Sequence, residues 1–194
     1  MGPLQGIKIL EFSGIGPGPY CGMLLADLGA DVIRLNRKDQ KGVENKYDIH
    51  NRSKRSITAD LKDPNVTEQI LNLIKQMDVV FEGFRPGVME KLGLGPEDCL
   101  KINESLVYGR MTGWGQDGPM AKQAGHDINY ISLSGALNSI GRKNSNPLAP
   151  LNLVGDYGGG GMHLAVGILS ALISSMKTNK GQVVDSAMVD GSLS

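Results

Sequence analysis

The sequence predicts an α/β fold, a Rossmann-like parallel sheet with flanking helices. An apolar run at residues 7–12 has the length of a buried strand, and a glycine-rich turn, a helix pattern and a strand pattern at 31–35 follow it. The same alternation of strands and helices continues to residue 112. A count of 27 glycines, with only 5% aromatic residues, suits a fold with many tight loops.

The first helix has the repeat of a helix with one buried face. Apolar residues at positions 21, 24, 25 and 28 recur at i, i+3, i+4 and i+7, and a glycine at position 29 supplies the stop. The turn before this helix contains Gly14-x-Gly16, as dinucleotide-binding loops do, but Pro19 occupies the third glycine position. The second strand also lacks the acidic residue that would hold a ribose. We therefore expect a structural turn and no NAD site.

The remaining elements follow in order. The patterns predict strands at 56–60, 78–84 and 106–111, a helix after Asp63-Pro64, and short helices at 88–92 and 97–103. Glycine-rich and polar loops then lead to an apolar helical segment and to a strand at 183–189. Residues 190–192 begin a further element just before the sequence ends, so we expect the first part of a longer protein.

Composition argues against several classes of partner. The chain has 20 basic residues (Lys plus Arg) and 20 acidic residues (Asp plus Glu). Its net charge is therefore zero, and no overall electrostatic attraction to nucleic acid or to a membrane surface is expected. The longest apolar stretch, 162–176, contains a histidine and three serines and is short for a membrane span. Cys21 and Cys99 have no metal-ligand spacing and are expected to be reduced thiols. We expect a soluble cytoplasmic protein with no metal.

The segment 34–55 is locally basic. Most of its charges suit a solvated surface loop, but several cations beside a glycine-rich turn could also form a phosphate-binding rim. The absence of interleaved aromatic residues argues against nucleic acid. The basic residues are Arg34, Arg37, Lys38, Lys41, Lys46, Arg52, Lys54 and Arg55.

His126 and Asp156 are the candidates for general acid–base chemistry. Each lies beside flexible glycine-containing backbone, and an imidazole and a carboxylate can both be tuned toward neutral pH. The glycines at 158–161 then open into a helix whose backbone N–H groups could face an anion. A structural role for His126 and a helix-capping role for Asp156 explain the same residues equally well. His50 is expected in solvent, and His163 within an apolar face.

Eight segments resemble one known family. Their combination is similar to the α-methylacyl-CoA racemase branch of the family III CoA-transferase superfamily, and it covers almost the entire chain. The transferases share the Gly-Asp element but lack the histidine of the Ala-Gly-His-Asp motif, so His126 favours the racemase branch. The segments are 11–19, 25–31, 59–62, 82–96, 110–116, 124–130, 150–156 and 181–185.

The resemblance implies a reaction and a set of site residues. His126 and Asp156 would exchange the α-proton of a 2-methylacyl-CoA thioester on opposite faces, without a cofactor, since CoA is part of the substrate. Backbone N–H groups at the glycine-rich helix entry would stabilise the enolate oxygen. Arg37 would contact a CoA phosphate. The remaining substrate-binding residues implied are Ala59, Asp60, Leu61, Lys62, Gly83, Phe84, Arg85, Lys91, Gly125, Asp127, Ile128, Asn129 and Tyr130.

The resemblance also bears on assembly and completeness. Family members are roughly twice as long, supply a further acidic residue that supports the histidine, and form interlocked homodimers. Residues 1–194 would then be the N-terminal part of the large domain, with the linker toward a small domain that the sequence lacks. Two alternatives stay open, a CoA-transferase with Asp156 as nucleophile and a non-catalytic CoA-binding or dimerisation fragment. A eukaryotic source would move the expected location to peroxisomes or mitochondria.

Overall fold

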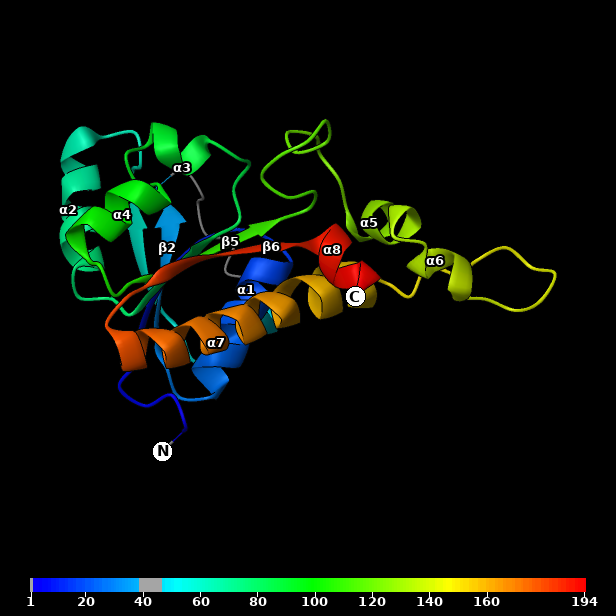
Figure 1. The fold of residues 1–194 in the computed structure, drawn as a ribbon, viewed down its shortest axis with the longest axis horizontal. Helices are drawn as coiled ribbons and strands as arrows, with labels where there is room; N and C mark the ends of the chain where they lie inside the picture. The colour runs from blue at the N-terminus through cyan, green and yellow to red at the C-terminus, as the bar shows by residue number, and fades with distance from the viewer. Residues whose placement is uncertain (1, 39–46) are drawn as a thin grey trace.

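The computed structural model describes residues 2–38 and 47–194, and its body is a parallel sheet covered by helices on both faces (Figure 1). The strands are β1 Lys8–Phe12, β2 Asp31–Arg37, β3 Arg55–Ala59, β4 Val79–Glu82, β5 Val107–Thr112 and β6 Gln182–Ala187. The α-helices are α1 Pro17–Asp27, α2 Pro64–Ile74, α3 Val88–Lys91, α4 Pro96–Ile102, α5 Asp127–Leu133, α6 Ala136–Ser139, α7 His163–Thr178 and α8 Met188–Leu193. A 3-10 turn, η1, spans Ile49–Asn51, and a π-helix, η2, spans Leu153–Met162.

The sheet confirms the predicted fold class. Its order is β3-β2-β1-β4-β5-β6, and every neighbouring pair is parallel. From β1 the chain proceeds outward to β2 and β3, and α2 then carries it back to β4 on the other side of β1. Strand order therefore reverses between β1 and β4. In such sheets a crevice opens beyond the carboxyl ends of the two strands at the reversal.

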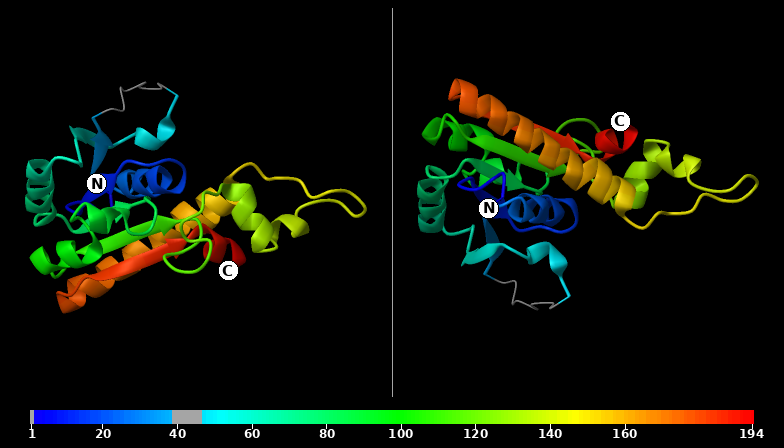
Figure 2. Two further views of the ribbon diagram at one scale, coloured as in Figure 1. Left: turned by 90° about the horizontal axis from the view of Figure 1, so that it is seen from above. Right: turned by 90° about the horizontal axis from the view of Figure 1, so that it is seen from below.

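Two apolar cores lie on opposite faces of the sheet, because alternate strand residues point to opposite sides. Ile9, Val79 and Val107 pack with α1 and α7 in one core, while their neighbours Leu10, Val80 and Tyr108 pack with α2 and α4 in the other. Figure 2 shows α7 lying along β5 and β6, with the long axis of the helix beside both strands. Both faces of the central strands are thus covered, as a parallel sheet requires.

The region after β5 departs from the pattern predicted from sequence. Residues 127–139 form α5 and α6, and together with the loop at 140–152 they project from the body as an arm (Figures 1 and 2). The predicted strand at 183–189 ends at Ala187, where α8 begins. The glycine-rich run does not start a regular α-helix. It lies inside η2, where wide turns bring Gly159 to Gly161 against α8 and α1.

The helix formed by η2 and α7 is longer than the apolar stretch at 162–176. In the described residues one segment, Leu153–Thr178, is long and apolar enough to cross a membrane by length and composition alone. Half of its most apolar window is buried inside the protein. Leu164, Ile168 and Leu172 of this window belong to the core on the sheet face. Burial of this kind is what a core helix of a globular domain shows.

Candidate active site

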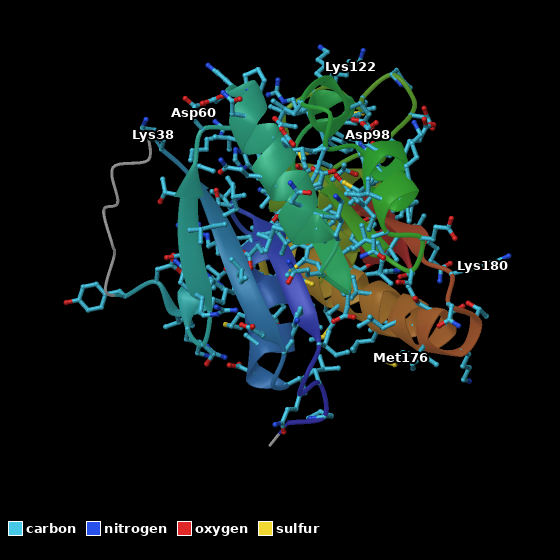
Figure 3. The ribbon with its side chains drawn as sticks, turned by 90° about the vertical axis from the view of Figure 1, so that its left-hand side faces the viewer. Lys38, Asp60, Asp98, Lys122, Met176 and Lys180 are labelled. Atoms are coloured by element: carbon cyan, nitrogen blue, oxygen red, sulfur yellow. The ribbon has the colours of Figure 1, made fainter. Side chains whose placement is uncertain are left out.

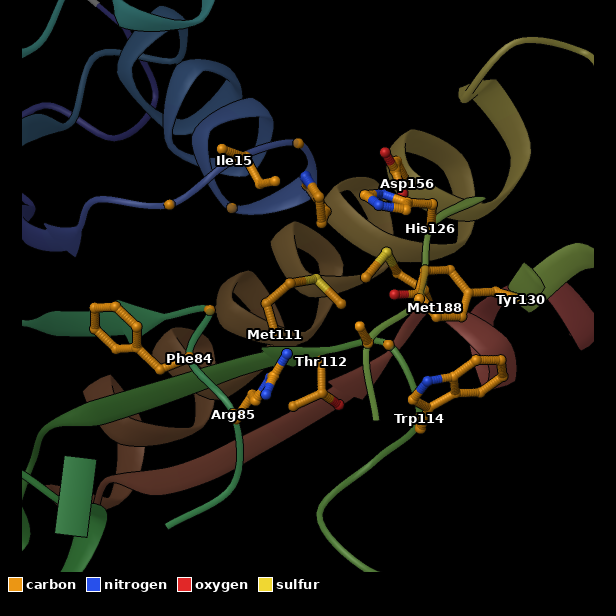
Figure 4. A pocket seen from close by; sticks show the side chains of 18 of the residues that line it. Ile15, Phe84, Arg85, Met111, Thr112, Trp114, His126, Tyr130, Asp156 and Met188 are labelled. Atoms are coloured by element: carbon orange, nitrogen blue, oxygen red, sulfur yellow. The ribbon is translucent and has the colours of Figure 1, made fainter. Parts of the chain in front are cut away.

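A cavity of about 470 Å³ opens at the carboxyl ends of β1, β4 and β5, at the reversal of strand order. Its wall combines segments from several distant parts of the chain, and Figure 4 shows the side chains that converge on it. The lining includes the turn at 14–18 after β1, the loop at 83–86 after β4, the segment at 111–114 at the end of β5, and the residues at 123–126 before α5. We call this space the reaction cavity.

His126, at the start of α5, and Asp156, on η2, both line the reaction cavity (Figure 4). His126 is exposed, and Asp156 is half-buried with Oδ2 accepting a hydrogen bond from Asn152 Nδ2 at 3.3 Å. Burial raises the pKa of the Asp156 carboxyl, and the nearby charge of Asp127 raises it further, while Asn152 and His126 oppose the rise. The imidazole and the carboxylate are therefore close enough to influence each other across one cavity.

Asp127 connects these two residues through the backbone. Its carboxylate is buried, and Oδ2 accepts hydrogen bonds from the N–H groups of Gly155 at 2.7 Å and Asp156 at 2.8 Å. The N–H of Tyr157 is bonded to the Asn152 carbonyl. The N–H groups of residues 155–157 therefore have partners within the protein and are not free to stabilise an enolate oxygen.

The predicted residues 125–130 separate into two groups. Gly125, His126 and Tyr130 line the reaction cavity, whereas in the described structure Asp127, Ile128 and Asn129 are not part of its wall. Asn129 instead accepts the His126 N–H on Oδ1 at 2.9 Å, and the Ile128 side chain is exposed. Asn129 and Asp127 therefore shape the backbone on which the cavity residues sit.

Tyr130 reaches the cavity between two glycines. A Cβ on Gly113 would lie 2.4 Å from the Tyr130 ring, and one on Gly125 would lie 2.7 Å from it. The ring also meets Trp114 edge to face at a centroid distance of 4.7 Å. Burial, followed by the charges of Asp156 and Asp127, raises the pKa of Tyr130 to about 12, so its hydroxyl stays protonated at neutral pH.

Several lining residues were not predicted. The turn at 14–18 was expected to be structural, yet it forms part of the cavity wall, and Trp114, which packs against the core, lines the cavity as well. A Cβ on Gly16, whose φ is +65°, would lie 3.2 Å from Asp156 Oδ2. The position of this turn at the carboxyl end of β1 is the sequence feature that could have indicated its role. Ile15, Met111 and Met188 add apolar surface to the wall.

A second cavity of about 420 Å³ lies beside the first, and Phe84 contributes to both. We call it the cationic cavity, because Arg37, Lys38 and Lys62 line it. Figure 3 shows Lys38 and Asp60 at the same end of the sheet, near α2. The Arg37 guanidinium lies 5.5 Å from the centroid of the Phe84 ring.

Most residues predicted for a nucleotide site gather at these two cavities. Ala59, Asp60, Leu61 and Lys62 line the cationic cavity with Arg37, while Gly83 and Arg85 line the reaction cavity. Lys91, exposed in the last turn of α3, is not in the described wall of either cavity.

The basic segment at 34–55 supplies fewer free cations than its sequence suggests. Arg52 pairs with Asp27 and Arg55 with Asp31, each at 2.5 Å. Lys54 is buried against Glu11 at 2.6 Å, and Arg34 donates to Asn51. Lys41 and Lys46 lie outside the described residues. The prediction of a phosphate-binding rim is therefore reduced to Arg37 and Lys38 in the described part of this segment.

Other predictions concern metals and the remaining histidines. In the described residues no group of three or more His, Cys, Asp or Glu side chains could hold a metal ion. His50 was expected in solvent, but it is half-buried and its ring lies 5.5 Å from that of Tyr157. Tyr157 also contacts Tyr20 at 4.7 Å, so an aromatic group packs behind Asp156.

Comparison with known proteins gives a consistent result. The sequence model of CoA-transferase family III matches residues 4–194. The chain is 50% identical over 190 residues to a human protein named alpha-methylacyl-CoA racemase, covering 97% of this chain and 48% of that protein. The mouse protein of the same name is 48% identical over 188 residues, with the same coverage. The chain thus spans about half the length of these relatives.

A solved structure gives the same fold. The crystal structure of a CAIB/BAIF family protein from Brucella suis superimposes with a TM-score of 0.89 at 33% identity. The match covers 99% of this chain and 55% of the Brucella chain. Sequence and structure therefore point to one family over almost the whole of this chain.

Proposed function

This chain belongs to CoA-transferase family III, and from that premise we propose that its protein is an α-methylacyl-CoA racemase. The observation that carries the proposal is the presence of His126 and Asp156 on the wall of one cavity. The two relatives named as racemases, at 50% and 48% identity, support it. A racemase needs one group to remove a proton and a second group to deliver one, and the reaction cavity holds two suitable groups.

The reaction uses the acidity of a carbon beside a thioester. A basic side chain takes the α-proton, the C–H electron pair forms a carbon–carbon double bond, and the carbonyl π pair moves to oxygen as an enolate. The conjugate acid of the other side chain then protonates the opposite face, and the electrons return. His126 and Asp156 would each serve one face. The raised pKa of Asp156 suits this role, because the same carboxyl must accept a proton in one direction and donate it in the other.

The two cavities together suggest how acyl-CoA would lie. The exposed cations of the cationic cavity would neutralise CoA phosphates, and the Phe84 ring at the boundary would guide the remainder of CoA toward the thioester site. The apolar side chains of Ile15, Met111 and Met188 would face the acyl group. We propose no further cofactor, because the thioester itself activates the α-carbon.

An exposed apolar surface supports the proposed homodimer. Val166, Ile173 and Met176 on α7 share one face with Met162 at the end of η2, and all four are exposed. Leu148, Leu151 and Leu153 are exposed on the arm and at the start of η2. Monomeric proteins seldom expose apolar surface of this extent. A second copy, interlocked through the arm as family resemblance implies, is the proposed cover.

We also propose that the protein works in a reducing compartment of the cell. Cys21 and Cys99 are free and buried, and burial raises the pKa of both thiols. Unreactive, unpaired cysteines are compatible with a reducing compartment such as the cytoplasm, or the interior of peroxisomes or mitochondria in a eukaryote.

Hydrogen isotope exchange tests the proposed function. The full natural protein is incubated with a 2-methylacyl-CoA in deuterated water, and deuterium at the α-carbon is followed by mass spectrometry. A racemase incorporates deuterium and interconverts the enantiomers without any acid acceptor. A lack of exchange would reject the proposal.

CoA transfer, the alternative activity, would give a different result in the same samples. A CoA-transferase with Asp156 as nucleophile would transfer CoA only when a carboxylic acid acceptor is added, and a trapped adduct would be found on Asp156. Testing the 194-residue chain beside the full protein distinguishes a non-catalytic fragment, which would bind CoA without catalysing exchange.

A further inference from the structure

Asp127 has an unusual position for a carboxylate that the sequence assigned to substrate binding. It is covalently next to His126, and only 4% of the residue is exposed. Oδ2 holds the N–H groups of Gly155 and Asp156 at 2.7 and 2.8 Å. One side chain therefore connects the two proposed proton-transfer residues, by a peptide bond on one side and by hydrogen bonds on the other.

The contact between Asp127 and Gly155 leaves no space for a side chain at position 155. A Cβ at that position would lie 2.9 Å from Asp127 Oδ2 and 3.0 Å from Asp127 Cγ. On the other side, Gly16 approaches the Asp156 carboxylate itself. The Asp156 backbone is thus fixed from beneath by Asp127, while its carboxylate is confined at the cavity wall.

The charge of Asp127 is poorly compensated. Its second oxygen, Oδ1, is buried without a hydrogen-bond partner in the described residues. Two neutral N–H donors share its negative charge, and a charge in a medium of low polarity acts more strongly on its neighbours than one in water. A fixed negative charge beside Asp156 makes that carboxyl hold a proton more readily.

We propose that Asp127 is a positioning residue that holds the Asp156 backbone in place opposite His126 and sets a buried negative charge beside the Asp156 carboxylate. The first effect sets where Asp156 can meet the substrate. The second makes Asp156 a stronger base and keeps its acid form populated nearer to neutral pH. The inference rests on the proposed function for its consequence in catalysis, but the coupling of the two carboxylates is a property of the chain itself.

Asp127→Asn separates charge from hydrogen bonding. The amide oxygen can still accept both N–H groups, so a residue that only caps η2 would be replaced with little effect. Under our proposal the Asp156 titration moves to lower pH, because the raising charge is removed. Carbon-13 NMR of the aspartate carboxyls in the 194-residue chain measures this, with the Asp156 signal assigned by its loss in Asp156→Asn.

Two further variants calibrate the measurement. Asn152→Ala removes a hydrogen bond that favours the charged form, so it is expected to move the Asp156 titration to higher pH. Asp117→Asn removes an exposed charge from the loop at 113–119 and is expected to leave the titration unchanged. If Asp127→Asn does not fold, Asp127→Ser keeps an acceptor oxygen in a smaller side chain. It is also expected to move the Asp156 titration to lower pH.

Activity provides the second measurement. In the full natural protein, Asp127→Asn is expected to lower kcat for isotope exchange by about tenfold to a hundredfold with KM nearly unchanged, because loss of the neighbouring charge weakens Asp156 as a base. The pH profile should shift to lower pH. An Asp156 titration that does not move in Asp127→Asn would overturn the proposal whatever the activity. If the Asp156 titration moves in Asp127→Asn but the wild-type protein shows no isotope exchange, the coupling is supported and the racemase function is rejected.

Discussion

The reaction cavity and the cationic cavity lie side by side, share Phe84, and are constructed in different ways. The reaction cavity depends on close approach, with glycines at 16, 113, 125 and 155 against side chains that leave no space for a Cβ. The cationic cavity depends on exposed, flexible cations, Arg37, Lys38 and Lys62. Geometry is therefore critical in the first cavity and net charge in the second.

Two lysines provide the strongest contrast. The Lys54 side chain is 2% exposed and donates hydrogen bonds to Glu11 Oε2 on β1 and to the Pro19 carbonyl on α1. Lys54→Met would leave the fully buried Glu11 without its closest cation, and we expect a loss of about 3–5 kcal/mol in unfolding free energy. Urea denaturation of the variant and wild type measures this loss.

Lys62→Met is the matched control, because it makes the same change at an exposed position. We expect its unfolding free energy to stay within about 0.5 kcal/mol of wild type. Adding Glu11→Gln to Lys54→Met should recover part of the lost stability, since the unpaired charge is then removed. Equal effects of the two lysine variants would contradict the contrast between a buried ion pair and an exposed cation.

Glycine substitutions compare two positions within the reaction cavity. Gly113→Ala places a methyl group 2.4 Å from the Tyr130 ring, which Trp114 holds in place, and should cost about 1–3 kcal/mol of stability. Gly14→Ala adds the same group where nothing lies within 4 Å. Thermal denaturation should show a lower Tm for the first variant only. A similar Tm in both would mean that Tyr130 can move aside.

Glu82 links the two cavities and gives a pH dependence. It is buried at the end of β4, accepts the Phe84 N–H at 2.6 Å, and has Arg110 at 3.4 Å, with Glu90 bound to the other side of Arg110. Burial raises its pKa from 4.5 to about 7, although the Phe84 N–H and Arg110 oppose the rise. Between these values the folded protein binds this proton more tightly than the unfolded chain, so stability falls as pH rises through the window.

Glu82→Gln should remove the part of the pH dependence of stability that is due to this carboxyl. At about 1.4 kcal/mol per pKa unit, the decrease attributable to Glu82 between pH 4.5 and 7 is at most about 3 kcal/mol. Unfolding free energies measured at several pH values for wild type and Glu82→Gln, with the exposed Glu104→Gln as control, give the difference in slope. Parallel curves for wild type and Glu82→Gln would show that Glu82 titrates as an exposed carboxyl does.

Arg37 gives the smallest expected effect. Arg37→Ala should weaken CoA binding by about tenfold, the equivalent of one charge-assisted contact, without changing stability. The loss should decrease at high salt, because an exposed charge is screened. Isothermal titration calorimetry with CoA measures it. Lys91→Ala, a cation outside the described walls of both cavities, should bind CoA as wild type does, and an equal loss there would place the nucleotide elsewhere.

The sequence predicted the parallel sheet well, because each strand and helix of the first 112 residues has its own apolar period and its own stop. It could not predict η2, since that helix depends on Asp127, nearly thirty positions earlier, binding the N–H groups of Gly155 and Asp156. Local patterns contain no information on such a distant contact.

The candidate site was predicted in part for a similar reason. His126, Asp156 and Tyr130 were identified, two of them from local composition and all from family resemblance. The approach of Gly16 to Asp156 depends on the packing of α1 against η2, two elements far apart in the sequence. Lys54 was expected to be solvated like the other cations of its segment, because its burial depends on Glu11 in a separate strand. The surroundings of each of these residues depend on contacts between elements that are far apart in the sequence.

The central claim is that His126 and Asp156 serve opposite faces of one substrate carbon. Isotope exchange into pure (R)- and (S)-2-methylacyl-CoA, measured separately for His126→Ala and Asp156→Asn in the full natural protein, tests it directly. We predict that both variants lose racemisation, that one still exchanges the α-proton of one enantiomer, and that the other variant prefers the opposite enantiomer. Loss of exchange from the same enantiomer in both variants, with the other enantiomer unaffected, would contradict a two-face mechanism.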